Sequence, residues 1–348
     1  MHDSFPPSAD SPRPDLGRRE LLAYTAALGS AMLVAPGDAR AADGPPKQKA
    51  ITKASRTPKR YEMKKSINLW AFPFPQQWSL KECFQIAKDA GFDGIEINFD
   101  ETGEFSAESS PQKLAAIGKM AKDVGIAISG VCSFLFWPYA LSSNDEAKRN
   151  RGLELASKMI HAAKLVGTEN LLVVPGAVYA PWVKDFDPVP NDVCDRRARE
   201  GVRKILPEAE KAGVYINIEN IFMNGFLFSP QEMNEFVDSF QNDHVRIHFD
   251  TGNIMHYQFP EHWVPILGKR IKNIHFKEAD KRVQEFNLHT FRTLLDGTTN
   301  WPAVIEALDK IDYRGYLTFE YFHPHQHFPE ALIYQASDAL DWMLGRKG

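Results

Sequence analysis

The sequence predicts an α/β protein whose main domain is a single (β/α)8 barrel. Short apolar runs alternate with amphipathic helical stretches from Ser66 to the end of the 348-residue chain. Eight strand-and-helix pairs within residues 63–348 match this fold in number and in length. In addition, polar residues end several of the apolar runs, at positions that would share one rim of a closed parallel barrel.

The expected strands are eight short apolar runs, at 66–71, 94–98, 126–132, 170–174, 214–219, 245–250, 271–276 and 316–320. The expected helices lie between and after them, at 79–90, 111–124, 145–166, 193–212, 229–239, 262–267, 301–311 and 330–345. Gly125 and Gly167 follow two of these helices, where a left-handed glycine ends a helix at low cost. Ser79, Asp145 and Ser229 are expected to cap helix N-termini.

A doubly wound open sheet also alternates strands and helices, so it is the competing fold. No Gly-x-Gly-x-x-Gly follows the first expected strand, which disfavours that sheet. The long loops fall on the strand-to-helix side, at 133–144, 175–192, 220–228 and 277–300. Because this side is the functional face of a barrel, the loops favour the barrel.

The first 41 residues resemble an export signal. Arg18 and Arg19 precede a modestly apolar stretch, and Ala39-Arg40-Ala41 provides a small-x-small site for signal peptidase. We therefore expect a twin-arginine signal over 1–41 and a periplasmic or otherwise exported protein, with a disordered tail as the alternative. The apolar stretch is too short for a permanent span, so we expect no membrane span in the mature form.

Residues 42–62 are rich in Lys, Pro and Ala, and we expect them to form a disordered linker before the single barrel domain at 63–348. The formal net charge is only −4 and no long basic stripe is present, which disfavours nucleic acid as a partner. Cys83, Cys132 and Cys194 are odd in number and widely spaced. They predict neither a disulfide framework nor a zinc motif, and fit small apolar positions instead.

The most informative pattern is a set of polar residues that end four successive apolar runs. These residues are Glu219, Asp250, His275 and Glu320. In a closed parallel barrel they would meet at one rim, as three carboxylates and one imidazole. Such a set suits one divalent metal ion, Mn²⁺ first, with Mg²⁺, Co²⁺ or Zn²⁺ as alternatives. Each residue taken singly is more often a solvated strand end, so the prediction depends on all four together.

The predicted chemistry follows from that set of ligands. A substrate with adjacent oxygens, such as a hydroxyketone, would use the open coordination positions, and the metal would stabilise an enediolate. Glu219 and Glu320 come from different strands and would approach a bound sugar from different sides. We therefore expect these two residues to be the catalytic acid and base.

Several motifs resemble those of the xylose-isomerase-like superfamily of TIM barrels. They are Ile-Glu-Asn at 218–220, Phe-Asp-Thr-Gly-Asn at 249–253, Ile-His-Phe-Lys-Glu at 274–278 and Thr-Phe-Glu at 318–320. Residues 219–230, 263–271 and 295–302 are similar to the L-ribulose/L-xylulose 5-phosphate 3-epimerase branch. The resemblance implies that Glu219, Asp250, His275 and Glu320 hold the metal, with Glu219 and Glu320 as the acid and base.

The sequence departs from the free-ketose 3-epimerases of that superfamily at two positions. Those enzymes usually carry a histidine three residues after the metal-binding aspartate, where this chain has Asn253. They also carry an extra glutamate just after the first ligand, where this chain has Gly225.

Five further residues are expected to bind substrate: Glu96, Trp137, Asn253, His256 and Lys277. Each follows or ends an expected strand on the functional side. The alternative for Glu96 is a rim carboxylate in a salt bridge. For Trp137, which would stack on the apolar face of a sugar, the alternative is core packing.

Together these observations predict a metal-dependent isomerase or epimerase of a sugar or related polyhydroxy carbonyl compound. The alternative is a metal-dependent dehydratase or lyase that acts on keto-sugars, keto-glycosides or inososes. A non-catalytic sugar-binding barrel is a further alternative. A three-metal nuclease is disfavoured because Asn253 stands where that class has a histidine and no basic face is evident. The expected partner is a small sugar-like molecule, and a homo-oligomer is possible.

Overall fold

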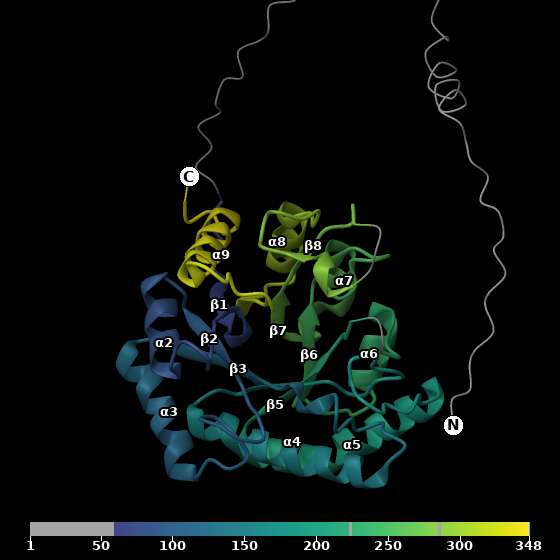
Figure 1. Ribbon diagram of the computed structural model, residues 1–348. Helices are drawn as coiled ribbons and strands as arrows, with labels where there is room; N and C mark the ends of the chain where they lie inside the picture. Colours follow the sequence, from purple (N-terminus) through teal and green to yellow (C-terminus); the bar gives the residue numbers. More distant parts are fainter. Residues whose placement is uncertain (1–58, 223–224, 284–286, 348) are drawn as a thin grey trace, which may run out of the picture. The chain divides into compact units, whose positions relative to one another are not determined.

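The (β/α)8 barrel predicted from the sequence is confirmed. A computed structural model describes residues 59–222, 225–283 and 287–347. Its parallel strands close in the order β1-β10-β7-β6-β5-β4-β3-β2, and the helices lie outside them (Figure 1). All strand pairs of the barrel are parallel, so the carboxyl ends of the strands meet at one rim.

The barrel strands lie within two residues of the predicted starts and three of the predicted ends. They are β1 (Lys64–Asn68), β2 (Gly94–Asn98), β3 (Ala127–Cys132), β4 (Asn170–Val173), β5 (Tyr215–Glu219), β6 (Val245–Asp250), β7 (Ile271–Phe276) and β10 (Tyr316–Phe319). The first strand is shorter than predicted, because Leu69–Ala71 form a 3-10 turn. The side chain of Asn68 accepts a hydrogen bond from the amide of Trp70 and so caps this turn.

The predicted helices are also present. They are α2 (Leu80–Asp89), α3 (Pro111–Val124), α4 (Glu146–Val166), α5 (Asn191–Ala212), α6 (Pro230–Asp238), α7 (Pro260–Leu267), α8 (Trp301–Lys310) and α9 (Pro329–Met343). Ser79, Asp145 and Ser229 accept hydrogen bonds from first-turn amides, as expected of N-caps. Gly125 and Gly167 end their helices at φ values of 83° and 89°, in the left-handed region.

One small element was missed from the sequence. Within 277–300, β8 (Glu278–Ala279) and β9 (Phe291–Arg292) form a two-stranded antiparallel sheet. Two-residue strands are too short to show a period, so no sequence pattern announces them. The buried carboxylate of Glu278 stabilises this connection by accepting hydrogen bonds from the amides of Leu295 and Thr299. The sheet holds Phe291 beside the rim of the barrel.

Alternation along the strands separates an apolar layer from a polar one. Ile218, Phe249, Ile274 and Phe319 are fully buried in the apolar core that includes the surrounding helices. The residues on either side of them in the chain point the other way, into the barrel. The rim residues of this inward set are the four predicted ligands, and below them lie Asn217, His248, Asn273 and Thr318.

The predicted export signal and residues 42–58 of the predicted linker lie outside the described residues. The linker's last four residues contact the barrel, since the amide of Tyr61 donates to the carbonyl of Leu344 at 3.0 Å. Lys59 forms an ion pair with Asp309 at 2.6 Å. Among the described helices, none combines the length and hydrophobicity needed to cross a membrane.

The three cysteines are buried and unpaired, as their spacing predicted. Burial raises the pKa of the Cys194 thiol to about 12 and that of Cys83 still further. The thiols therefore stay protonated at neutral pH and behave as small apolar groups.

Close packing of α3 on α4 gives a test of the fold. A methyl group added to Gly118 would lie 2.7 Å from the backbone oxygen of Val166, which cannot move aside like a side chain. We expect Gly118→Ala to lower the free energy of unfolding by about 1–3 kcal/mol, measured by urea denaturation.

Gly201→Ala is the matched helical control. The added methyl group would meet only the side chain of Leu141, at 3.3 Å. Its helix propensity gain of about 0.5–1 kcal/mol should therefore offset most of the crowding. Equal destabilisation by the two variants would contradict the role of the Val166 backbone contact.

Candidate metal centre

The structure brings the four residues predicted as ligands together at the carboxyl rim of the barrel. Glu219 ends β5, Asp250 ends β6, His275 is the fifth residue of β7 and Glu320 directly follows β10. Each offers one ligand atom, and these atoms all lie within 4.8 Å of one another. All four side chains are buried, and Glu219 is the most exposed residue at 8%.

The imidazole of His275 lies at the centre of the cluster. Its Nδ1 is 3.2 Å from Glu320, 3.3 Å from Glu219 and 3.9 Å from Asp250. Its Nε2 points away from the other ligands, toward the interior of the barrel. One nitrogen therefore faces the candidate metal position while the other is available for an orienting contact.

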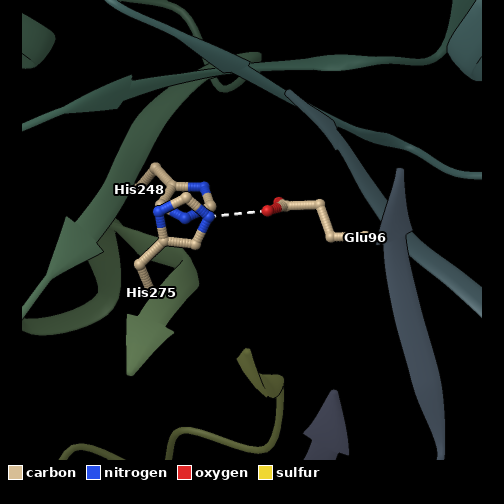
Figure 2. Close-up of side chains that lie close together, drawn as sticks. All are labelled: Glu96, His248 and His275. Atoms are coloured by element: carbon tan, nitrogen blue, oxygen red, sulfur yellow. Dashed lines mark hydrogen bonds and ion pairs between the residues drawn. The ribbon is translucent and has the colours of Figure 1, made fainter. Parts of the chain in front are cut away.

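Glu96 makes that orienting contact. Its Oε2 lies 2.6 Å from Nε2 of His275, and Figure 2 shows the carboxylate facing the imidazole. The same oxygen accepts a hydrogen bond from the side-chain amide nitrogen, Nδ2, of Asn68 at 2.7 Å. A carboxylate in this position holds Nε2 protonated and leaves the Nδ1 lone pair for a metal.

His248 completes this buried group beneath the rim. Its ring packs edge-on against that of His275, with centroids 4.1 Å apart (Figure 2). Burial lowers the pKa of His248 well below its usual value, so the ring is neutral. Within the described part of the chain, neither of its ring nitrogens has a hydrogen-bond partner. His248 therefore supports the ring of His275 by packing.

Asp250 is oriented by the turn that follows β6. Its Oδ1 accepts hydrogen bonds from the amides of Gly252 at 2.8 Å and Asn253 at 2.9 Å. Its Oδ2 is left to face the cluster and lies 2.7 Å from Nζ of Lys277. Gly252 is required here, because an added Cβ would lie 2.8 Å from Cγ of Lys277. The Thr-Gly pair after the aspartate thus makes room for the lysine.

Lys277 is the cation of the cluster. Its Nζ pairs with Asp250 and with Glu320, and donates to Oδ1 of Asn253 at 3.0 Å. Burial alone would lower its pKa, but the carboxylates of Asp250, Glu320 and Glu219 outweigh that effect and raise it. Lys277 is therefore charged, and its ammonium group is paired with carboxylates of the cluster.

Three buried carboxylates lie around one lysine, which pairs with two of them, so the rim carries more negative charge than Lys277 balances. Burial raises the pKa of Glu219 and Asp250. Burial also opposes a charge on His275, but Glu320, Glu96 and Glu219 together raise its pKa well above the usual value. Excess carboxylate charge around one imidazole fits a divalent cation, and oxygen-rich sets of this kind suit Mn²⁺ or Mg²⁺.

A pocket of about 420 Å³ opens above the cluster. Its floor includes Glu219, His275, Lys277 and Glu320, whereas Asp250 lies beneath it. Most of the remaining wall is apolar, formed by Trp70, Phe134, Trp137, Leu172, Val174, Trp182, Ile221, Phe222, Leu288, Phe291 and Phe322, with Ser133 and Asn253 as the other polar members.

The five residues predicted to bind substrate have different positions in the structure. Trp137, Asn253 and Lys277 line the pocket, and their role in substrate binding stays a prediction. Glu96 lies outside the lining, beneath His275, and thus has the imidazole as its partner rather than the pocket. His256 lines a neighbouring hollow together with Asn253.

Several aromatic residues that line the pocket were not predicted from the sequence. Trp182 lies in the long loop after β4, Phe291 lies in β9, and Phe322 lies between β10 and α9. Their positions past strand ends were visible, but nothing local distinguishes a pocket aromatic from an exposed loop aromatic.

Comparison with known proteins agrees with this geometry. A sequence model of the family described as "Xylose isomerase-like TIM barrel" matches residues 84–344, which include all four clustered residues. The chain belongs to this family. The family resemblance predicted from the strand-end motifs is therefore confirmed.

The relatives lie in the branch suggested by the motifs. The chain is 25% identical over 264 residues to a putative L-ribulose-5-phosphate 3-epimerase, SgbU, of Escherichia coli K12, covering 74% of this chain and 89% of that protein. It is also 25% identical over 280 residues to the L-ribulose-5-phosphate 3-epimerase UlaE of Escherichia coli O1:K1, covering 79% and 92%. A solved structure of L-ribulose 3-epimerase is similar in fold, with a TM-score of 0.67, 19% identity and coverage of 82% and 96%.

The contact between Glu96 and His275 can be tested by metal titration. Glu96→Gln keeps the size of the side chain but removes the negative charge that holds Nε2 protonated. We expect the affinity for Mn²⁺, measured by isothermal titration calorimetry, to fall about 10–100-fold. Glu306→Gln is the control, because Glu306 is an exposed residue of α8 that pairs with Lys310, outside the cluster. Unchanged affinity in Glu96→Gln would contradict the orienting role.

The raised pKa of His275 predicts a proton release. Since the ion-free imidazole holds a proton on each nitrogen, metal binding at Nδ1 must displace one of them. We expect about one proton or more to leave per Mn²⁺ bound at pH 7, and the affinity to rise with pH. Titrations in buffers of different ionisation enthalpy measure this release, and a binding enthalpy independent of the buffer would refute it.

Proposed function

We propose that this protein is a divalent-metal-dependent epimerase or isomerase of a sugar or a related polyhydroxy carbonyl compound. The observation that carries the proposal is the placement of two buried glutamates, Glu219 and Glu320, in the floor of one pocket. They flank His275 from β5 and from the end of β10, with β6 and β7 between them in the barrel. The epimerase names of the relatives support the same reaction class.

Four residues would hold the metal: Glu219, Asp250, His275 and Glu320. When bound by these residues, a divalent ion, which we propose to be Mn²⁺, would supply Lewis-acid polarisation of the substrate carbonyl, which would make the neighbouring C–H more acidic. The protein's own residues prepare this position. Glu96 fixes the ring of His275, and Lys277 holds the carboxylates of Asp250 and Glu320 in place.

The two glutamates would carry the proton. One carboxylate removes the proton from the carbon next to the carbonyl, and the C–H electron pair forms the double bond of an enediolate. The other carboxyl group returns a proton to the opposite face, so the product is an epimer of unchanged composition. Burial raises the pKa of Glu219 above its usual value, which favours proton uptake by this carboxylate.

A dehydratase or lyase would share the first step and differ in the second. There the enediolate electron pair expels a substituent from the neighbouring carbon, and the substituent leaves with a proton. Mass spectrometry of the product separates the two reactions, because epimerisation leaves the mass unchanged and elimination removes water or an alcohol.

Proton transfer to carbon can be measured directly. The protein with Mn²⁺ is incubated in D₂O with a panel of keto-sugars and keto-glycosides, and deuterium uptake at carbon is followed by NMR. We expect Glu219→Gln and Glu320→Gln each to reduce exchange by about 10²–10⁴-fold, because an amide cannot carry the proton.

Glu235→Gln is the control, since Glu235 is an exposed residue of α6. The Mn²⁺ content of each variant is measured in parallel, so that loss of the ion is separated from loss of the proton carrier. Deuterium exchange at the wild-type rate in either variant with the ion bound would exclude the assigned roles.

A further inference from the structure

The pocket above the cluster has two chemically different halves. The floor holds the carboxylates, the imidazole and the lysine described above, whereas the outer wall is aromatic. Trp70 and Phe134 lie with ring centroids 4.5 Å apart on one side, and Trp137 and Trp182 lie 4.9 Å apart in an edge-on pair on another. These rings can pack on the apolar face of a sugar, but they offer no hydrogen-bond acceptor for its outer hydroxyl groups.

The outer wall also lacks a charge for a phosphate. Among the lining residues that the structure describes, Lys277 is the single lysine or arginine, and its Nζ is paired with Asp250 and Glu320. The rings of Phe291 and Phe322 cover the same ammonium, at 4.5 Å and 5.1 Å. A phosphate would therefore meet two carboxylates at the floor and hydrocarbon above it.

Arg292 is a cation that directly follows the pocket residue Phe291 in the chain. Its guanidinium donates to the backbone carbonyls of His289 and Phe291 and takes no part in the pocket lining. Residues 223–224 and 284–286, whose placement is not described, contain neither lysine nor arginine. These two segments therefore contribute no lysine or arginine.

The outer aromatic side chains are exposed to an unusual degree. Phe134 is 47% exposed and Trp182 is 43% exposed, although both line the pocket. Exposed apolar surface gathered at a pocket is typical of a binding site for an apolar group. The pocket volume of 420 Å³ also lies in the range of about 300–1,000 Å³ that encloses ligands larger than a single sugar.

We infer that the substrate is a keto-glycoside with an uncharged aromatic aglycone, an inference that rests on the proposed function. The sugar ring lies at the floor, and the aglycone lies between the aromatic side chains of the outer wall. A glycosidic bond locks the anomeric carbon as an acetal. The carbonyl needed for proton removal is therefore an oxidised ring carbon, with the transferred proton on the carbon beside it.

The test compares four probes by isothermal titration calorimetry on the Mn²⁺-loaded protein. They are phenyl β-D-glucopyranoside, methyl β-D-glucopyranoside, glucose and glucose 6-phosphate. We expect the phenyl glucoside to bind about tenfold or more tightly than the methyl glucoside, because its ring stacks in the aromatic wall. Glucose 6-phosphate is expected to bind no more tightly than glucose.

Two tryptophan variants locate the preference. Trp182→Ala should reduce the ratio of phenyl to methyl affinity to about twofold or less. Because Trp182 is partly exposed, its removal leaves the buried hydrophobic core intact. Trp342→Ala is the matched control, since Trp342 is a 61% exposed residue of α9 outside the pocket lining, and should keep the wild-type ratio.

Equal affinities for the two glucosides, undetectable binding of the phenyl glucoside, or tighter binding of glucose 6-phosphate than of glucose would overturn the inference. These affinities are measured without turnover. A missing aromatic preference therefore counts against the substrate class, whereas a missing deuterium exchange counts against the proposed function.

Discussion

The structure depends on the burial of three carboxylates around one imidazole at the rim of the barrel. Glu219, Asp250 and Glu320 have lost nearly all contact with water, and Lys277 is the cation that pairs with two of them. Buried charges are costly unless they are paired and hydrogen-bonded. The surrounding residues reduce that cost, since backbone amides and Lys277 bind Asp250, and His275 lies between the other two carboxylates.

Because of the polar cluster, the inner layer of the barrel contains polar side chains where apolar ones are usual. Such barrels commonly fill their interior with branched apolar side chains. Here Glu96, His248 and His275 form a buried group directly beneath the rim (Figure 2). This layer has less apolar packing than is common. Glu96 in this layer fixes which nitrogen of His275 faces the candidate metal position. The same few side chains therefore affect both the packing of the barrel interior and the orientation of His275.

Above the cluster, the character of the pocket changes within a short distance. The floor holds carboxylates, an imidazole and a lysine, whereas the outer wall is aromatic. The relatives SgbU and UlaE are named for a sugar phosphate, whereas the inferred substrate of this protein carries an uncharged aromatic group. Function in this fold depends on such loop residues, because the strands hold the chemistry and the loops select the molecule.

The sequence by itself determined the barrel and the four strand-end residues that cluster at its rim. Apolar periodicity, glycine stops and residue type are local properties, so Glu219, Asp250, His275 and Glu320 could be read along the chain. Only the tertiary structure decided what those residues contact. Glu96 reaches His275 across 179 positions, and Trp182 joins Trp137 from another loop. Such partners depend on closure of the barrel and on side-chain direction, and no local pattern encodes either.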